Sequence, residues 1–293
     1  MTDAAFLGVD LAWGLGTADR PANETGLVAL DAAGAVLDAG WTRGVDDTAR
    51  WVLDRLGPRT LVGVDASLVV TNPARTMRAA ERQVGQRYGR WRVTANPTHL
   101  GMPHQAGARL LDALTEHGVA YVDDTASMRG RTGPALFECY PYTTIVGVEE
   151  LGYDDERPRY KRLDQYVDRT EARARRATAF DELVRRLGTL DDPPLRLDAH
   201  PVTAALAREP AGVLDRAYKH REDLLDGALC AWTAAYWDRH GDDRVQVLGT
   251  DPALPQDPVD AQGRRAVVVA PARPAQRRPL DAAPARPGPH RTV

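Results

Sequence analysis

Two short apolar segments of the chain end in the same way, on an aspartate. Phe6-Leu7-Gly8-Val9-Asp10 and Leu61-Val62-Gly63-Val64-Asp65 each read as a β-strand that stops at a carboxylate. If these strands are parallel neighbours, both aspartates reach the same edge of the sheet, where their like charges repel each other. A hard divalent cation such as Mg²⁺ binds carboxylate oxygens and offsets that repulsion. The pair therefore predicts a metal site.

Two further acids lie in apolar surroundings. Glu138 sits inside the apolar strand predicted for residues 135–140, and Asp226 lies on the strongly apolar helix predicted for residues 222–240. A carboxylate inside an apolar strand is costly to bury without a partner or an ion. For Glu138 the structural alternative is a buried salt bridge to an arginine. Asp223, one turn before Asp226, is interpreted as a residue that stabilises the helix start, in preference to a second helical ligand.

The order of the predicted elements determines how these acids can meet. The first strand is followed by a hairpin of residues 26–30 and 35–41, and then by an amphipathic helix at 46–56. The helix leads into the second Gly-Val-Asp strand, so the crossover places that strand parallel to the first. The fold class is therefore α/β, with a mixed sheet of a three-strand antiparallel meander plus parallel strands. Helices flank the sheet, with helical insertions, and residues 245–248 and 266–269 predict a final hairpin.

The composition limits the class of protein. With 293 residues, 43% of them hydrophobic, the chain can bury one large core, and we assign residues 1–270 to a single domain. Residues 271–293 are rich in Pro, Ala and Arg and are predicted to be a disordered tail. No apolar stretch has the length of a membrane helix and no secretory signal is evident, so we expect a cytoplasmic protein without a membrane partner. Cys139 and Cys230 are expected to be packed, reduced thiols.

Four phrases of the sequence resemble those of domain-of-unknown-function family 429. They are GVDLAW at 8–13, VGVDASL at 62–68, FECYP at 137–141 and HREDLLDGALCAW at 220–232. The likeness covers residues 4–240, approximately. Members of that family are usually described as predicted nucleases with a ribonuclease H-like fold. The resemblance therefore implies this fold and a metal-dependent phosphodiesterase that acts on nucleic acid.

The resemblance also implies the residues of the site, in a layout comparable to that of Holliday-junction resolvases. A site of this kind holds two ions, Mg²⁺ or Mn²⁺, of which one activates water and the other stabilises the leaving oxygen. The catalytic and metal-binding residues would be Asp10, Asp65, Glu138 and Asp226. The candidates for substrate binding are Asn72, Arg78, Glu81 and Lys161. Lys161 would neutralise a phosphate near the metals, and its alternative role is that of a surface lysine.

Two other functional classes stay open. An actin-like phosphotransferase also has a first strand that ends in Gly-x-Asp, but it needs Gly-rich and Ser/Thr-rich turns around the phosphates. The turns after Asp10 and Asp65 are poor in such residues, and the sequence contains no Gly-x-x-x-x-Gly-Lys-Ser/Thr loop. The other class is a non-catalytic nucleic-acid or protein binder of the same fold. Loss of one acid of the quartet would have favoured it, but all four acids are present. The net charge of −3 argues against a uniformly basic surface for duplex binding but allows a local basic groove.

Overall fold

The computed structural model describes residues 4–17, 19, 21–212 and 215–277, and within them the main sheet has six strands in the order β3-β2-β1-β4-β6-β5. β1 pairs antiparallel with β2, and β2 with β3, whereas β1, β4, β6 and β5 are parallel to one another. The predicted meander and parallel return strand are confirmed, in an arrangement consistent with a ribonuclease H-like fold. The strands are β1 (Ala4–Asp10), β2 (Glu24–Leu30), β3 (Val36–Arg43), β4 (Leu56–Val64), β5 (Ala120–Tyr121) and β6 (Ala135–Glu138).

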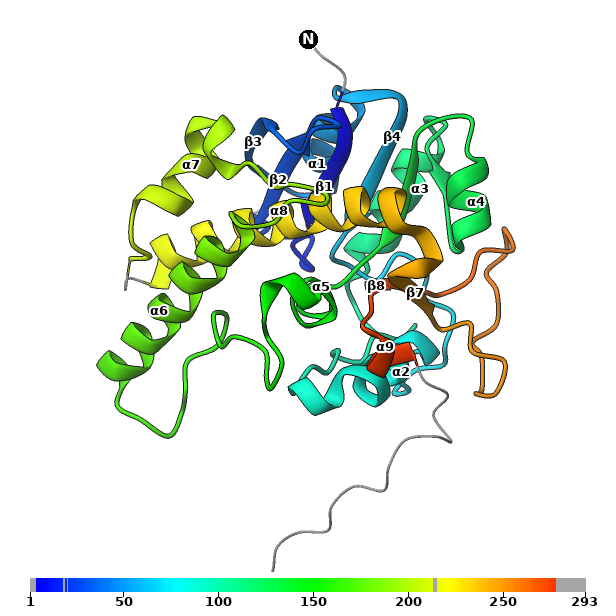
Figure 1. The fold of residues 1–293 in the computed structure, drawn as a ribbon. Coiled ribbons are helices and arrows are strands. Elements are labelled where there is room, and N and C mark those ends of the chain that lie inside the picture. Colours follow the sequence, from blue (N-terminus) through cyan, green and yellow to red (C-terminus); the bar gives the residue numbers. More distant parts are fainter. Residues whose placement is uncertain (1–3, 18, 20, 213–214, 278–293) are drawn as a thin grey trace, which may run out of the picture.

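Helices cover both faces of the sheet (Figure 1). Helix α8 (Asp215–His240) runs across one face over β1, β2 and β4, while α1 (Val45–Leu53) and α3 (Ala106–Thr115) lie on the other. Strands β7 (Val245–Leu248) and β8 (Val268–Pro271) form the predicted final hairpin. Further helices are α2 (Ala79–Tyr88), α4 (Thr125–Gly130), α5 (Pro141–Gly147), α6 (Arg169–Leu187), α7 (Pro201–Arg208) and α9 (Pro274–Arg277).

The alternation of side chains along β1 and β4 determines which face the two aspartates reach. Val9 and Val64 are paired in register and belong to the apolar core on the side of α1 and α3. Because successive strand side chains point to opposite faces, Asp10 and Asp65, one residue further along, face α8. The backbone N–H of Asp65 donates to the Val9 carbonyl, which keeps the two strand ends level. The two aspartates therefore leave the sheet together, as predicted.

Helix α8 crosses the sheet at backbone contact distance because glycines lie under it. A Cβ on Gly8 would lie 1.9 Å from the carbonyl oxygen of Gly227, and one on Gly63 would lie 2.5 Å from that of Cys230. Both separations are too short for any side chain. The glycine of each Gly-Val-Asp phrase therefore brings the helix down onto the sheet, so that acids on α8 can reach the level of the strand ends.

We expect Gly8→Ala to lower the free energy of unfolding by about 3 kcal/mol, because the added methyl group would meet helix backbone that no rotamer change can move. Gly40→Ala is the matched control, since Gly40 also lies in a strand but has no atom within 4 Å of its Cβ position. Its effect should stay within about 0.5 kcal/mol. Urea unfolding followed by circular dichroism measures both, and equal midpoints would contradict the close crossing of α8.

Residues 271–277 pack against the domain, which corrects the predicted start of the tail. Pro271 ends β8 and α9 follows directly. Gln276 is 1% exposed, and the Arg273 guanidinium donates to the Val146 carbonyl. The predicted boundary was wrong because local composition does not reveal these long-range contacts. The rest of the predicted tail, residues 278–293, lies outside the described residues.

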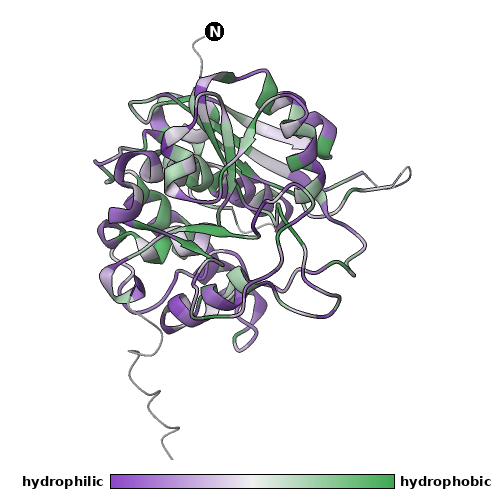
Figure 2. Cartoon of the chain, turned by 90° about the vertical axis from the view of Figure 1, so that its right-hand side faces the viewer, coloured by the Kyte–Doolittle hydropathy of each residue, from purple (hydrophilic) through white to green (hydrophobic). Residues whose placement is uncertain are grey.

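The hydropathy of the elements agrees with this layering, since the strands of the main sheet are mainly apolar and the outer helices carry much of the hydrophilic sequence (Figure 2). No helix in the described part of the chain is long and apolar enough to cross a membrane. Cys139 and Cys230 are buried and form no disulfide, which confirms the prediction of packed thiols.

Candidate active site

Four aspartates from three elements lie around the carboxyl ends of β1 and β4. Asp10 ends β1 and Asp65 follows β4, whereas Asp223 and Asp226 lie one turn apart on the same face of α8. The carboxyls of Asp10 and Asp223 are in hydrogen-bonding contact. Gly26 on β2 permits this approach, because a Cβ there would lie 1.9 Å from the Asp223 carbonyl oxygen. We call these four residues the acid cluster.

Asp223 corrects the interpretation that it stabilises the start of a helix. Helix α8 begins at Asp215, about two turns before the predicted start at residue 222, so Asp223 lies in the helix interior. It is 4% exposed and faces the sheet. The signal that could have identified it is its spacing of three residues from Asp226, which places both carboxylates on one helix face.

Lys161 and Tyr160 contact the acid cluster from the segment that follows α5. The Lys161 Nζ lies 2.6 Å from Asp226 Oδ2 and 4.0 Å from Asp65 Oδ2. The Tyr160 hydroxyl donates to Asp226 Oδ1 at 2.6 Å. Asp226 is fully buried, and its Oδ2 is in ion-pair contact with Lys161 without the geometry of a hydrogen bond. Lys161 therefore lies in the site, as the resemblance implied, while Tyr160 was not predicted.

Burial and repulsion between carboxylates raise the pKa values of Asp10, Asp65 and Asp223. Burial, then Asp226 and Asp65, hold the pKa of Asp10 well above its usual value. Burial raises the pKa of Asp65 to about 7, with Lys161 opposing the shift and Asp226 adding to it. Burial and Asp226 also raise the pKa of Glu222, beside the cluster, to about 7. The site therefore retains protons near neutral pH that a bound cation would displace.

Glu138 belongs to a different hydrogen-bond network from the acid cluster, although its charge adds to the raised pKa of Asp65. Strand β6 pairs with β4 so that Glu138 is level with Val64, and Val64 faces the α1 and α3 side of the sheet. The Glu138 carboxylate accepts from Arg78 Nη1 at 2.8 Å and Nη2 at 2.5 Å, and from the Leu68 N–H at 3.0 Å. The residue level with the strand aspartates is Cys139, directly after β6, whose N–H donates to the Val64 carbonyl. Glu138 thus forms the buried salt bridge that was its alternative role.

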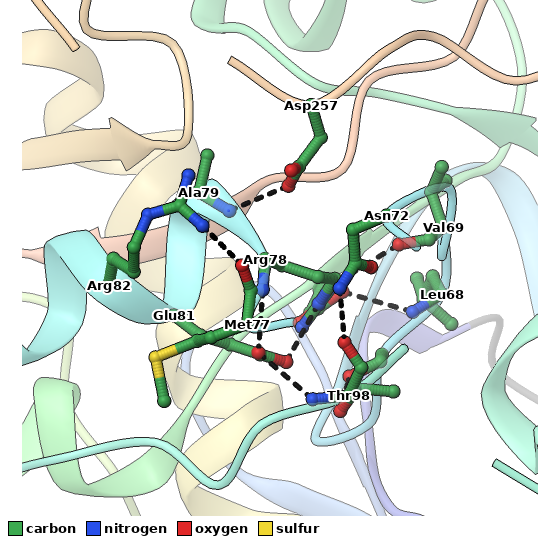
Figure 3. A network of polar contacts seen from close by, with 12 residues as sticks. Leu68, Val69, Asn72, Met77, Arg78, Ala79, Glu81, Arg82, Thr98 and Asp257 are labelled. Carbon is green, nitrogen blue, oxygen red and sulfur yellow. Dashed lines mark hydrogen bonds and ion pairs between the residues drawn. The ribbon is translucent and has the colours of Figure 1, made fainter. Parts of the chain in front are cut away.

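Asn72, Arg78 and Glu81, the other substrate-binding candidates, form a buried network (Figure 3). Arg78 Nε donates to Glu81 at 2.8 Å, and Glu81 accepts from the Thr98 N–H at 3.0 Å. The Asn72 side-chain amide donates to the Thr98 carbonyl at 2.8 Å. None of the three candidates is more than 2% exposed. Because the network holds the segment directly after Asp65, it positions that aspartate and does not place these side chains at the open surface of the site.

An open hollow of about 380 Å³ lies over the acid cluster. The acids that line it are Asp10, Asp65, Asp223, Glu222 and Glu24. Its other lining residues include the basic side chains Arg157, Lys161, Arg162 and Lys219 and the aromatic side chains Trp13, Tyr140 and Tyr142. A larger, more open hollow of about 520 Å³ over β3 and α1 has charges held in ion pairs, such as Arg43 with Glu24. The smaller hollow joins the acid cluster to basic side chains, a combination suited to a cation and a phosphate together.

The donor chemistry of the acid cluster fits Mg²⁺ or Mn²⁺. All its ligand atoms are carboxylate oxygens, and Asp226 Oδ2 is a buried oxygen without a hydrogen bond. Among the residues that the structure describes, no three His, Cys, Asp or Glu side chains converge closely enough, as they stand, to hold a metal ion. The Lys161 ammonium contacts both Asp65 and Asp226. The acid cluster, rather than the predicted quartet with Glu138, is the group that would hold the ions.

The raised pKa values predict how the stability of the metal-free protein depends on pH. Asp65 and Glu222 release their protons near pH 4 when unfolded but near pH 7 when folded, so the native state binds more protons in between. Their contribution to the free energy of unfolding should therefore fall as pH rises from about 4 to about 7. Mn²⁺ should accordingly raise the unfolding temperature more at pH 8 than at pH 5.5, as measured by thermal scans with Mn²⁺ and with EDTA. Equal shifts at the two pH values would contradict this prediction.

A protein-family model described as "Protein of unknown function (DUF429)" matches residues 8–253, a segment that includes the whole acid cluster. No curated protein and no solved structure matches the chain.

Proposed function

Since the chain belongs to the DUF429 family of proteins of unknown function, we propose its activity from the site itself: metal-dependent hydrolysis of a phosphodiester bond in nucleic acid. The observation that carries the proposal is the partly buried acid cluster beneath a hollow with basic side chains. Four aspartates held together in a partly buried site destabilise the fold, and the raised pKa values of Asp10, Asp65 and Asp223 reflect that cost. Binding of divalent cations is the function that such an arrangement serves best.

Each group of residues has a role in this proposal. Asp10, Asp65, Asp223 and Asp226 would hold two Mg²⁺ or Mn²⁺ ions, which would supply Lewis acidity and an activated water. Lys161, which pairs with Asp226, is close enough to the cluster to pair with a phosphate oxygen. Arg157 and Arg162 line the same hollow and would bind neighbouring phosphates by charge-assisted hydrogen bonds. The substrate in this proposal is a nucleic acid met in the cytoplasm.

A panel of labelled nucleic acids tests the proposal. Single-stranded DNA and RNA, their duplexes, a hybrid and a branched junction are incubated with the protein in Mg²⁺ or Mn²⁺, and cleavage is followed on gels. We expect the wild type to cleave at least one of them and Asp65→Asn to cleave it at least ~100-fold more slowly, since one metal ligand is lost. Asp198→Asn is the matched control, because Asp198 is exposed on another part of the chain.

Two outcomes would contradict the proposal. ATP consumption, measured in a parallel assay, without cleavage of the panel would indicate the actin-like phosphotransferase. Binding of a nucleic acid without cleavage in either metal would indicate a non-catalytic binder of the same fold.

A further inference from the structure

Trp13 is an exposed tryptophan beside the acid cluster. It follows Asp10 by three residues and is 44% exposed, although Leu11 before it is only 3% exposed. The backbone N–H of Ala12 donates to the buried Thr25 hydroxyl at 3.0 Å, which fixes the start of this loop. Among the described residues, the indole has no hydrogen-bonding or ring partner. A large apolar side chain is thus presented at a defined place without a hydrogen-bonding or ring partner in the described part of the chain.

Several hollows meet at this side chain. Trp13 lines the hollow over the acid cluster and a smaller one of about 60 Å³ that extends toward Glu138. It also lines one of about 20 Å³ against Ser67 and the start of α3. The indole therefore stands beside the place where a phosphate would meet the acids, with open space around it.

The other lining residues of the main hollow suit a nucleic-acid backbone. The Arg157 guanidinium lies 4.1 Å from the centre of the Tyr142 ring, so this cation is held in place at the hollow. Arg162 also lines the hollow, is exposed, and has no ion-pair partner among the described residues. An aromatic surface and two cations around an acidic floor match the pattern of proteins that hold single strands, in which bases stack on aromatic rings while cations follow the phosphates.

We propose that Trp13 stacks on the nucleobase next to the phosphodiester bond that the site cleaves, and that the substrate is a strand whose base is unpaired at that point. The inference rests on the proposed function and names its substrate class. Stacking on an indole requires a free base face, and bases inside a continuous duplex have both faces covered by their neighbours. A small phosphoester would leave the exposed indole without a partner, so an unpaired strand is the better match.

A strand without bases isolates this contact. Fluorescein-labelled dT12 and an abasic strand of equal length carry the same phosphates, and their binding is compared by fluorescence anisotropy in Ca²⁺. We expect the wild type to bind dT12 at least ~10-fold more tightly than the abasic strand. Trp13→Leu should bind both strands with nearly equal affinity. Tyr166→Leu is the matched control and should keep the wild-type preference, because Tyr166 is an exposed aromatic residue that lines none of these hollows.

The outcomes separate this inference from the function on which it rests. A preference for dT12 that survives in Trp13→Leu, or is absent from the wild type, would overturn the role of Trp13. Binding of a blunt duplex as tightly as dT12 would overturn the substrate class. Hydrolysis of bis(p-nitrophenyl) phosphate in Mn²⁺ is measured in parallel on the wild type. Because this phosphodiester carries no base, its hydrolysis tests the proposed chemistry independently of Trp13. The affinity for U12 is measured in the same way. Because thymine and uracil offer similar stacking faces, a difference in affinity between dT12 and U12 shows whether the site prefers a DNA or an RNA strand.

Discussion

Replacing Asp10 by Asn is expected to abolish divalent metal binding and phosphodiester cleavage while making the metal-free protein more stable. Asp10 ends the central strand and contacts Asp223, so its loss removes a ligand from the middle of the acid cluster. We expect the affinity for Mn²⁺ and the cleavage rate each to fall at least ~100-fold. The same change removes a carboxyl whose pKa is held well above its usual value by burial, Asp226 and Asp65. Relief of that repulsion should stabilise the metal-free fold by about 1 kcal/mol, or about 2–4 °C.

The combination of these two effects is the informative result. Calorimetric titration with Mn²⁺ and a thermal scan in EDTA are run on the wild type, on Asp10→Asn and on the exposed control Asp198→Asn. If Asp10 only supported the fold, its replacement would lower the unfolding temperature of the metal-free protein. An Asp10→Asn variant that unfolds at a lower temperature in EDTA, or that binds Mn²⁺ as the wild type does, would contradict the account of the acid cluster.

Replacing Arg78 by Met is expected to lower the free energy of unfolding by about 3–5 kcal/mol. The Arg78 guanidinium pairs with Glu138 and Glu81, and all three side chains are almost completely buried. Removal of the cation leaves two buried carboxylates without compensation, which is the costly way to break a buried ion pair. Burial already raises the pKa of Glu138 even with Arg78 present. Without the guanidinium, the Glu138 carboxylate must take up a proton, or water must enter the core beside it.

Urea unfolding measures this effect against Arg109→Met, a matched change at an exposed position of α3. The double variant Arg78→Met with Glu138→Gln should recover part of the lost stability, because one uncompensated charge is removed. Metal binding should weaken by a smaller factor than in Asp10→Asn, since the network acts on Asp65 only through the segment that follows it. An Arg78→Met variant as stable as Arg109→Met would show that the pair contributes nothing to the fold.

The sheet and the strand aspartates were predictable because their signals are local. Each Gly-Val-Asp phrase contains the apolar residues, the strand end and the acid in one short segment, and the helix between them fixes a parallel return. The register then makes Asp10 level with Asp65. The role of each glycine under α8 was not predictable in this way, because it depends on which helix crosses the sheet.

Which acids form the cluster could not be predicted from local sequence, because it depends on strand register and on where a helix begins. Glu138 lies in an apolar strand, as predicted, but a shift of one residue along a strand reverses the face that a side chain reaches. The register places Cys139, and not Glu138, level with the strand aspartates. Asp223 was misjudged because the start of α8 was placed at residue 222 instead of Asp215. Arg78 meets Glu138 across 60 positions of sequence, a contact that no local pattern predicts.

Calorimetric titration of the metal-free protein with Mn²⁺ measures whether the acid cluster binds a divalent cation. Run at pH 7 in two buffers of different ionisation enthalpy, it measures both metal affinity and proton release. We expect saturable binding with release of protons, because the pKa values of Asp65 and Glu222 are raised to about 7 and a bound cation displaces their protons. We also expect weaker binding at pH 5.5. Absence of saturable binding, or an affinity that is the same at pH 5.5 and pH 8, would contradict these expectations.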